Sequence, residues 1–177
     1  MISKLKDSVL DKPASAGAVL VLLAAALSLG GAWYLQLFGG LFPCPLCLEQ
    51  RIPWYLAAGI AILVIVIPIL APHAAGWRMA ALLPNAGLMF WSAYLGAYHV
   101  GVEHQWWGSS CTGPGGEGTA TVEDLLAGIE TDNAVPCDAI QWEMFGITLA
   151  GMNMVISATL GAVLIYLFFK AWHDRDA

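Results

Sequence analysis

The chain has 177 residues, of which 59% are hydrophobic and 11% are charged, and its formal net charge is −6. Because a soluble domain usually carries about 25% charged residues, this composition excludes an ordinary soluble domain and predicts an integral membrane protein embedded in a lipid bilayer. We expect no nucleic-acid partner.

Four apolar runs, at about residues 15–38, 52–70, 77–100 and 147–169, are each long enough for a transmembrane helix. A helix of about 20 residues rises about 30 Å, which is the thickness of the hydrocarbon core. Backbone groups in lipid must bond to one another, and period-2 alternation is absent, so helices are predicted rather than a β-barrel. The first run follows a basic start but is too long for a cleaved signal peptide, so we interpret it as a retained anchor.

The predicted fold class is therefore an all-α membrane protein, a four-transmembrane-helix bundle that forms a single domain over residues 1–177. Two loops, at about 39–51 and 101–146, lie on one side of this bundle. Six of the basic residues fall on the other side: Lys4, Lys6, Lys12, Arg78, Lys170 and Arg175. The positive-inside rule makes that side cytoplasmic, with both chain termini on it. Arg51 is the one basic residue on the outer side.

The second outer loop, residues 101–146, contains several acidic residues and no Lys or Arg. Within it, Val122, Leu125, Leu126 and Ile129 follow i, i+3, i+4, i+7 spacing, which predicts a short amphipathic helix. We expect this helix to lie at the membrane interface with its apolar face down. The alternative, that it packs on other loop residues, stays open.

All four cysteines lie in the two outer loops: Cys44 and Cys47 in the first, Cys111 and Cys137 in the second. Their position in an oxidising compartment permits disulfide bonds. Four cysteines allow three pairings, and the sequence does not decide among them. Adjacency within each loop favours Cys44–Cys47 and Cys111–Cys137 in the resting protein.

The Cys-Pro-Leu-Cys segment of the first outer loop suggests redox chemistry. Pro45 suits the first position of a helix, with Cys44 as its cap and Cys47 in its first turn. Unpaired backbone N–H groups and Arg51, four residues further on, would both stabilise a thiolate at Cys47. Pro53 leaves open whether the long helix begins at Pro45 or only at Pro53.

Two other interpretations of the first cysteine pair are a structural disulfide and a zinc site. A four-cysteine zinc site usually needs a second close pair, whereas Cys111 and Cys137 are 26 residues apart, so we expect no metal. Arg51 has two interpretations as well. It extends to lipid phosphates, or it binds the polar end of an apolar electron carrier such as a quinone.

The ordered set of a Cys-x-x-Cys between the first two helices, an Arg four residues later and a second cysteine pair before the last helix resembles the DsbB family. The segments "VEHQWW" before Cys111 and "CDAIQW" from Cys137 also resemble that family. The resemblance covers nearly the whole chain. It implies a thiol oxidase of the bacterial inner membrane, which reoxidises a DsbA-like periplasmic protein of thioredoxin fold and passes the electrons to ubiquinone or menaquinone.

The same resemblance implies a role for each matching residue. Cys111 would form the mixed disulfide with the partner, and Cys137 would exchange with Cys44. Cys47 would meet the quinone as a thiolate, with Arg51 beside a ring oxygen. His104 would lie near the quinone, although an interfacial histidine bonded to loop groups remains the alternative. His73 and His99 receive no role.

Two other classes of protein remain possible from the sequence. One is a vitamin K epoxide reductase-like quinone reductase, although the active Cys-x-x-Cys of that family lies on the fourth helix rather than between the first two. The other is a non-catalytic protein with four transmembrane helices and two structural disulfides.

Overall fold

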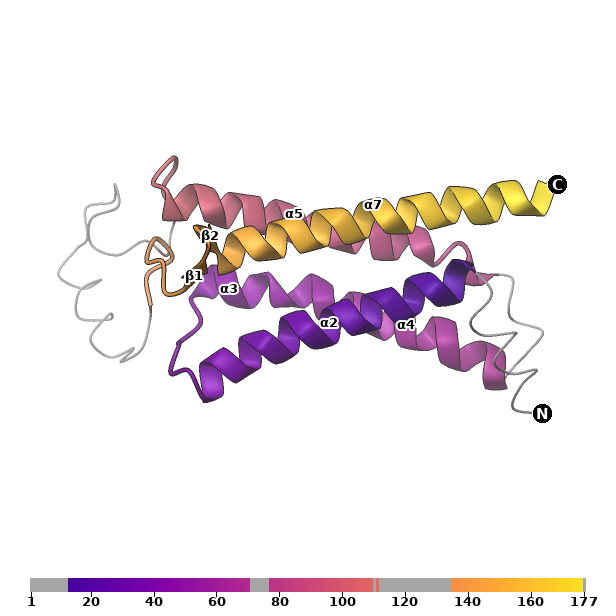
Figure 1. Cartoon of the computed structure of the whole chain (residues 1–177), viewed down its shortest axis with the longest axis horizontal. Helices are drawn as coiled ribbons and strands as arrows, with labels where there is room; N and C mark the ends of the chain where they lie inside the picture. Colours follow the sequence, from indigo (N-terminus) through magenta and orange to yellow (C-terminus); the bar gives the residue numbers. More distant parts are fainter. Residues whose placement is uncertain (1–12, 71–76, 110, 112–134, 177) are drawn as a thin grey trace.

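The computed structural model describes residues 13–70, 77–109, 111 and 135–176. Its elements are α2 (Pro13–Leu37), α3 (Pro45–Glu49), α4 (Arg51–Leu70), α5 (Leu82–Glu103), β1 (Glu143–Met144), β2 (Ile147–Thr148) and α7 (Leu149–Asp176). The long helices run side by side along one axis, with α3 and the two short strands gathered at one end (Figure 1). The start of α2 and the end of α7 lie at the opposite end.

Three of the described helical segments are long and apolar enough to cross a membrane: Pro13–Leu37, Pro45–Ile67 and Leu149–His173. Large apolar side chains are exposed along the outer faces of these helices, among them Leu23, Leu63 and Val155. Such faces suit lipid rather than water. The prediction of a mostly helical membrane protein is thus confirmed in its broad form.

The helix α5 is not one of these three segments. It carries buried polar residues on the face that meets the other helices, namely Asn85, Ser92 and His99. Those residues lower its average hydropathy without exposing polar groups to the outside. The expectation that α5 is a fourth span stays a prediction. The proposed interfacial helix within residues 101–146 and the N-terminal lysines lie outside the described residues.

One feature without a sequence prediction is the small hairpin of β1 and β2. Glu143 pairs with Thr148 and Met144 with Ile147. The two turn residues, Phe145 and Gly146, both have positive φ, at 54° and 75°. Two residues of positive φ are what a tight hairpin turn of the type I′ class requires. The hairpin leads directly into α7.

The bundle packs most extensively where α5 meets α7, and α2 packs on α4 and α7. The α5–α7 contact depends on Gly96. A Cβ atom added there would lie 2.9 Å from the backbone nitrogen of Met154 and 3.0 Å from the carbonyl oxygen of Ala150. Because both neighbours are backbone atoms, they cannot move aside as a flexible side chain can, and the helices would have to separate.

We therefore expect Gly96→Ala to lower the free energy of unfolding by roughly 1–3 kcal/mol. Thermal unfolding in detergent measures this as a lower midpoint temperature. Gly87→Ala on the same helix is the matched control, because a Cβ at Gly87 meets no atom within 4 Å. That control should be neutral or stabilising, since alanine favours helix. Equal midpoints for the two variants would contradict the close approach.

Candidate active site

The first cysteine pair begins a short helix. Cys44 is the N-cap of α3, Pro45 occupies the first turn, and the Cys44 sulfur accepts a hydrogen bond from the Cys47 backbone N–H at 3.2 Å. The helix therefore starts at Pro45, one of the two predicted positions. It is interrupted at Gln50, where α4 follows from Arg51. Pro53 explains the interruption, because its ring lacks an N–H and crowds the carbonyl four residues earlier.

All four cysteines gather at this end of the bundle. Cys44 and Cys137 are buried in one apolar cluster, and Cys47 and Cys111 pack against it. Cys111 and Cys137 form a disulfide with a Cα–Cα distance of 5.4 Å, inside the usual range. Cys44 and Cys47 are thiols whose sulfurs lie 2.7 Å apart. The second-loop pairing that adjacency favoured is present, and the first-loop pair is reduced.

The two thiols of the first pair are not equivalent. The Cys44 thiol donates its hydrogen bond to the Cys47 sulfur. That hydrogen bond and burial of the side chain raise the pKa of Cys44. A negative charge on this pair is therefore favoured on Cys47 rather than on Cys44. The Cys47 N–H donates to the Cys44 sulfur, whereas the Cys44 thiol, the Cys44 backbone and the charge of Arg51 all favour a thiolate at Cys47.

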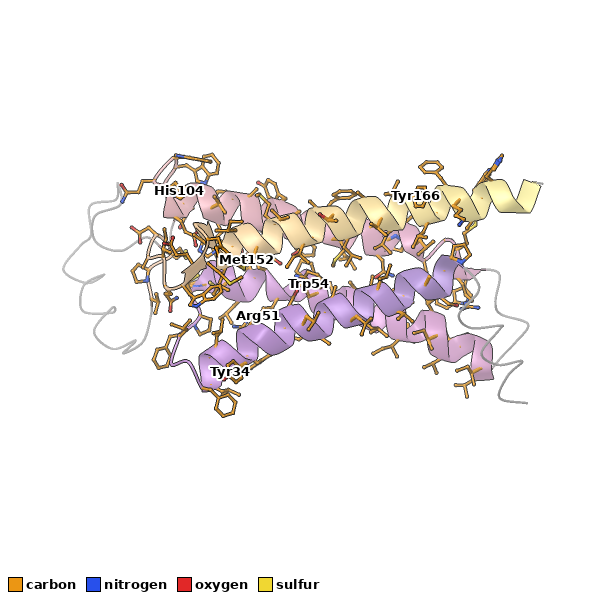
Figure 2. All side chains as sticks on the ribbon, viewed as in Figure 1. Tyr34, Arg51, Trp54, His104, Met152 and Tyr166 are labelled. Carbon is orange, nitrogen blue, oxygen red and sulfur yellow. A yellow bond between two sulfur atoms is a disulfide. The ribbon has the colours of Figure 1, made fainter. Side chains whose placement is uncertain are left out.

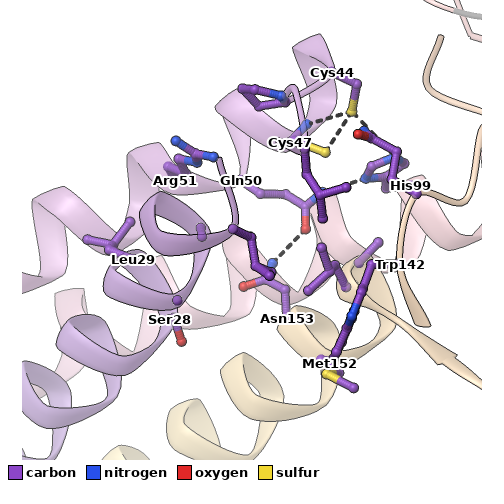
Figure 3. A pocket seen from close by; sticks show the side chains of 18 of the residues that line it. Ser28, Leu29, Cys44, Cys47, Gln50, Arg51, His99, Trp142, Met152 and Asn153 are labelled. Atoms are coloured by element: carbon purple, nitrogen blue, oxygen red, sulfur yellow. Dashed lines mark hydrogen bonds between the residues drawn. The ribbon is translucent and has the colours of Figure 1, made fainter. Parts of the chain in front are cut away.

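A cavity of about 330 Å³ opens beside the thiols. Its wall is mostly apolar, with side chains from α2 and α7 such as Leu29 and Met152, while Cys47 and Arg51 supply polar groups (Figure 3). A mostly apolar cavity with a few placed polar groups is typical of small-molecule sites. Both residues that the sequence placed on one face, Cys47 and Arg51, line it.

The side chain of Arg51 is held against α2. Its Nη1 atom donates to Gln36 Oε1 at 3.1 Å, and its guanidinium carbon lies 5.3 Å from the centre of the Trp33 ring. The cation–π contact and the hydrogen bond orient the guanidinium at the cavity wall. This position favours a role toward a cavity ligand over an extension to lipid phosphates.

A set of buried and half-buried polar residues lies behind the thiols, on α5, on α7 and around the start of α4, and the sequence assigned none of them a role. His99 of α5 lies 3.7 Å from the Cys44 sulfur and 2.7 Å from Gln50, which in turn bonds Asn153 of α7 (Figure 3). Asn153 also bonds Trp54 of α4. The available sequence signal was Asn153 itself, a strongly polar residue near the start of an apolar span.

His104 lies elsewhere. It is the C-cap of α5, is exposed, and packs its ring against Trp106 with centroids 5.4 Å apart. Figure 2 shows it at the outer end of α5, away from Arg51. The described residues that line the cavity do not include His104, whereas they do include Glu103 and His99. Its role near a quinone stays a prediction.

Among the described residues, Cys44, Cys47 and His99 present ligand atoms within 4.8 Å of one another, a spacing that suits a metal ion. The His99 nitrogen that faces the sulfurs, Nε2, also lies 3.1 Å from the carbonyl oxygen of Cys137. A carbonyl only accepts, so this nitrogen carries a proton and has no lone pair for a metal. The arrangement fits thiol chemistry better than metal binding.

Comparison with known proteins identifies the family. The family model described as "Disulfide bond formation protein DsbB" matches residues 14–167. A disulfide bond formation protein B of Azoarcus sp. strain BH72 is 28% identical over 166 residues, covering 86% of this chain and 89% of that protein. The protein of the same name from Nitrosomonas eutropha is 29% identical, and the match covers 88% of this chain and 95% of that protein. The one from Hahella chejuensis is 30% identical, and the match covers 88% of this chain and 92% of that protein.

No solved structure matches the chain at a significant level. The family match nevertheless spans all four cysteines, Arg51 and the cavity beside them. On this evidence, the chain belongs to the DsbB family of disulfide bond formation proteins.

Proposed function

We propose that this chain is a membrane thiol:quinone oxidoreductase that reoxidises a DsbA-like periplasmic dithiol protein and so supports disulfide bond formation. The observation that carries the proposal is the placement of two cysteine pairs in one cluster beside an apolar cavity. One pair belongs to the second outer loop, with Cys111 half-buried and Cys137 buried, and the other pair lines the cavity. This arrangement suits electron transfer from a protein thiol to an apolar acceptor.

We further propose a single domain with four spans, in which α5 crosses the bacterial inner membrane together with α2, α4 and α7. Its extensive packing on α7 and its inward polar face support this. The start of α2 and the end of α7 lie at the end away from the cysteines (Figure 1). With the basic residues near those ends, the positive-inside rule favours cytoplasmic termini and periplasmic cysteines.

The proposed relay begins at the second pair. A thiolate of the partner attacks Cys111, the Cys111–Cys137 bond breaks, and Cys137 becomes a thiolate. In a chain whose first pair is oxidised, Cys137 then attacks Cys44, and Cys47 leaves with the electron pair. The second thiol of the partner frees Cys111, which attacks Cys137 and releases Cys44. Of the two protons that the partner loses, one ends on Cys44 and one in water.

The state seen in the structure, with Cys111–Cys137 bonded and the first pair reduced, corresponds to the end of this relay. A quinone, ubiquinone or menaquinone, would supply the two-electron acceptor if bound in the cavity. The apolar wall of the cavity suits its ring, and Arg51 and Cys47 would hold its polar edge. The hydrogen bond that the Cys44 thiol donates stabilises the thiolate of Cys47, so Cys47 stays in its reactive, deprotonated form.

The alternatives from the sequence are less well supported. A protein with two structural disulfides would not keep Cys44 and Cys47 as neighbouring thiols beside a cavity. The family match favours a DsbB-type oxidase over a vitamin K epoxide reductase-like enzyme.

The test is turnover by the purified protein in detergent, with reduced DsbA as the thiol donor and ubiquinone-1 or menadione as the acceptor. We expect repeated oxidation of DsbA only when a quinone is present. Without it, each protein molecule should oxidise no more than about two DsbA molecules, one for each cysteine pair. Oxidation that continues at the same rate without quinone, or that never exceeds this limit with it, would refute the proposal.

A further inference from the structure

The polar residues behind the thiols form a chain of hydrogen bonds in which each donor and acceptor can be assigned, beginning with Trp54. The indole nitrogen of tryptophan only donates, and Trp54 Nε1 lies 2.8 Å from Asn153 Oδ1. The oxygen of this amide therefore faces Trp54, and its nitrogen faces the other way. The backbone carbonyl of Ser92, which accepts from Asn153 Nδ2 at 3.3 Å, requires the same orientation.

The orientation passes from Asn153 to Gln50. Asn153 Nδ2 donates to Gln50 Oε1 at 2.8 Å, so Gln50 Nε2 must point away. Gln50 Nε2 lies 3.4 Å from the carbonyl of Leu46, which it can only donate to. It also lies 2.7 Å from His99 Nδ1. Because an N–H2 group has no lone pair to offer, His99 Nδ1 is the acceptor in this contact.

The tautomer of His99 follows. With Nδ1 accepting, the proton of the neutral ring is on Nε2. The carbonyl of Cys137, at 3.1 Å from Nε2, independently requires a proton there. A charged ring would direct a second N–H at the Gln50 amide hydrogens, so this network favours the neutral form. Glu103 Oε1 lies 4.0 Å from the same Nε2 atom, and Glu103 Oε2 accepts from Thr148 at 2.6 Å.

We infer that His99 is a catalytic hydrogen-bond donor to the Cys44 sulfur, and that Trp54, Asn153 and Gln50 are positioning residues that hold it in the donating tautomer. The Nε2–H group lies 3.7 Å from Cys44 Sγ, a reacting atom of the proposed relay, on which this inference rests, and it shares its one proton between this sulfur and the Cys137 carbonyl at 3.1 Å. His99 is 4% exposed, so water does not compete strongly for this contact.

The donor is needed when Cys44 leaves. In that step Cys111 attacks Cys137, the Cys111–Cys137 bond forms, the Cys44–Cys137 bond breaks, and the electron pair remains on Cys44. Cys47 already carries a negative charge at that moment, with its sulfur 2.7 Å from that of Cys44 in the end state. Forming a second thiolate beside the first raises the electrostatic free energy unless hydrogen-bond donors face the new charge. Among the residues that the structure describes, the Cys47 N–H at 3.2 Å and His99 Nε2–H at 3.7 Å are donors that face the Cys44 sulfur.

The tautomer is tested directly, without any turnover, by ¹⁵N NMR of histidine-labelled protein in its reduced first-pair state. His99 is assigned by the signal that disappears in His99→Gln. We expect a protonated Nε2 and an unprotonated Nδ1 in the wild-type protein, and a larger share of the other tautomer in Gln50→Leu, where only the Cys137 carbonyl still favours the proton on Nε2. A protonated Nδ1 with a bare Nε2 in the wild-type protein would overturn the inference.

The chemical role is tested by single-turnover transfer from reduced DsbA to quinone-free protein whose first pair is oxidised. Alkylation quenching and mass spectrometry follow the appearance of free Cys44 and Cys47. We expect His99→Leu to slow this internal transfer about tenfold or more, the effect of losing one hydrogen bond to a charged group. His99→Gln should restore much of the rate, because its amide donates but cannot act as an acid or base at neutral pH.

The control is His173→Leu, at an exposed histidine near the end of α7, which should transfer at the wild-type rate. Thermal unfolding identifies any variant that has lost its fold, and the NMR measurement on the wild-type chain does not depend on those variants. If His99→Leu transfers at the wild-type rate, or His99→Gln is equally slow, His99 is not a donor. If no variant and no wild-type protein transfers, the relay itself is wrong while the tautomer result still stands.

Discussion

Replacing Cys47 with alanine is expected to lower quinone reduction by about 10³-fold or more, the usual cost of removing a reacting nucleophile. Cys47 is the sulfur that accepts the hydrogen bond of the Cys44 thiol and lines the cavity. Without it the first pair cannot close, and no sulfur next to the cavity carries a charge. The measurement is the steady-state loss of ubiquinone-1 absorbance with reduced DsbA as donor.

The same variant contains its own control. Cys111 and Cys137 remain bonded in it, so a single addition of reduced DsbA should still reduce this disulfide at close to the wild-type rate. Loss of both reactions would point to a folding defect, and thermal unfolding would show it. Retention of steady-state quinone reduction would mean that Cys47 is not the residue that faces the acceptor.

Replacing Arg51 with methionine is expected to raise the KM for a short-chain quinone about 10–100-fold. The guanidinium is the one cation among the described residues that line the cavity, and a hydrogen bond to a charged group contributes about 1.5–3 kcal/mol. The single-turnover reaction of DsbA with the Cys111–Cys137 disulfide should not change. Stopped-flow kinetics at several quinone concentrations measure both.

Arg51→Lys is the matched variant, because it keeps the charge and loses the planar fork that contacts Gln36 and Trp33. We expect it to recover only part of the affinity. If Arg51 binds lipid phosphates instead, the KM of Arg51→Met will equal that of the wild-type protein and its thermal stability in lipid will fall. That outcome would remove Arg51 from the proposed quinone site.

Much of the architecture was readable from local pattern. Apolar length located α2, α4 and α7, and the Cys-Pro-Leu-Cys spacing correctly predicted a helix that begins at Pro45 with Cys44 as its cap. Helical spacing also placed Cys47 and Arg51 together, and both line one cavity. In each case residues a few positions apart determine the result, so no knowledge of the helix packing was needed.

The contacts among the polar residues behind the thiols could not be predicted from local sequence patterns. The contact of Gln50 with His99 spans 49 residues and its contact with Asn153 spans 103, so both depend on how three helices rotate against each other. Local spacing also could not show that the Cys47 N–H would serve the Cys44 sulfur. His104, which the resemblance placed near the quinone, is not among the described residues that line the cavity, and its role near a quinone stays a prediction.

The directional chain from Trp54 to His99 has an evolutionary consequence. Each member fixes the orientation of the next, so a change at one position reverses or breaks the hydrogen bonds at the others. Relatives that lack the histidine therefore have no need for an amide at the position of Gln50, and those that keep it should keep an amide there and at Asn153. These four positions, drawn from three segments of the chain that lie far apart in sequence, are expected to be inherited or replaced as one unit.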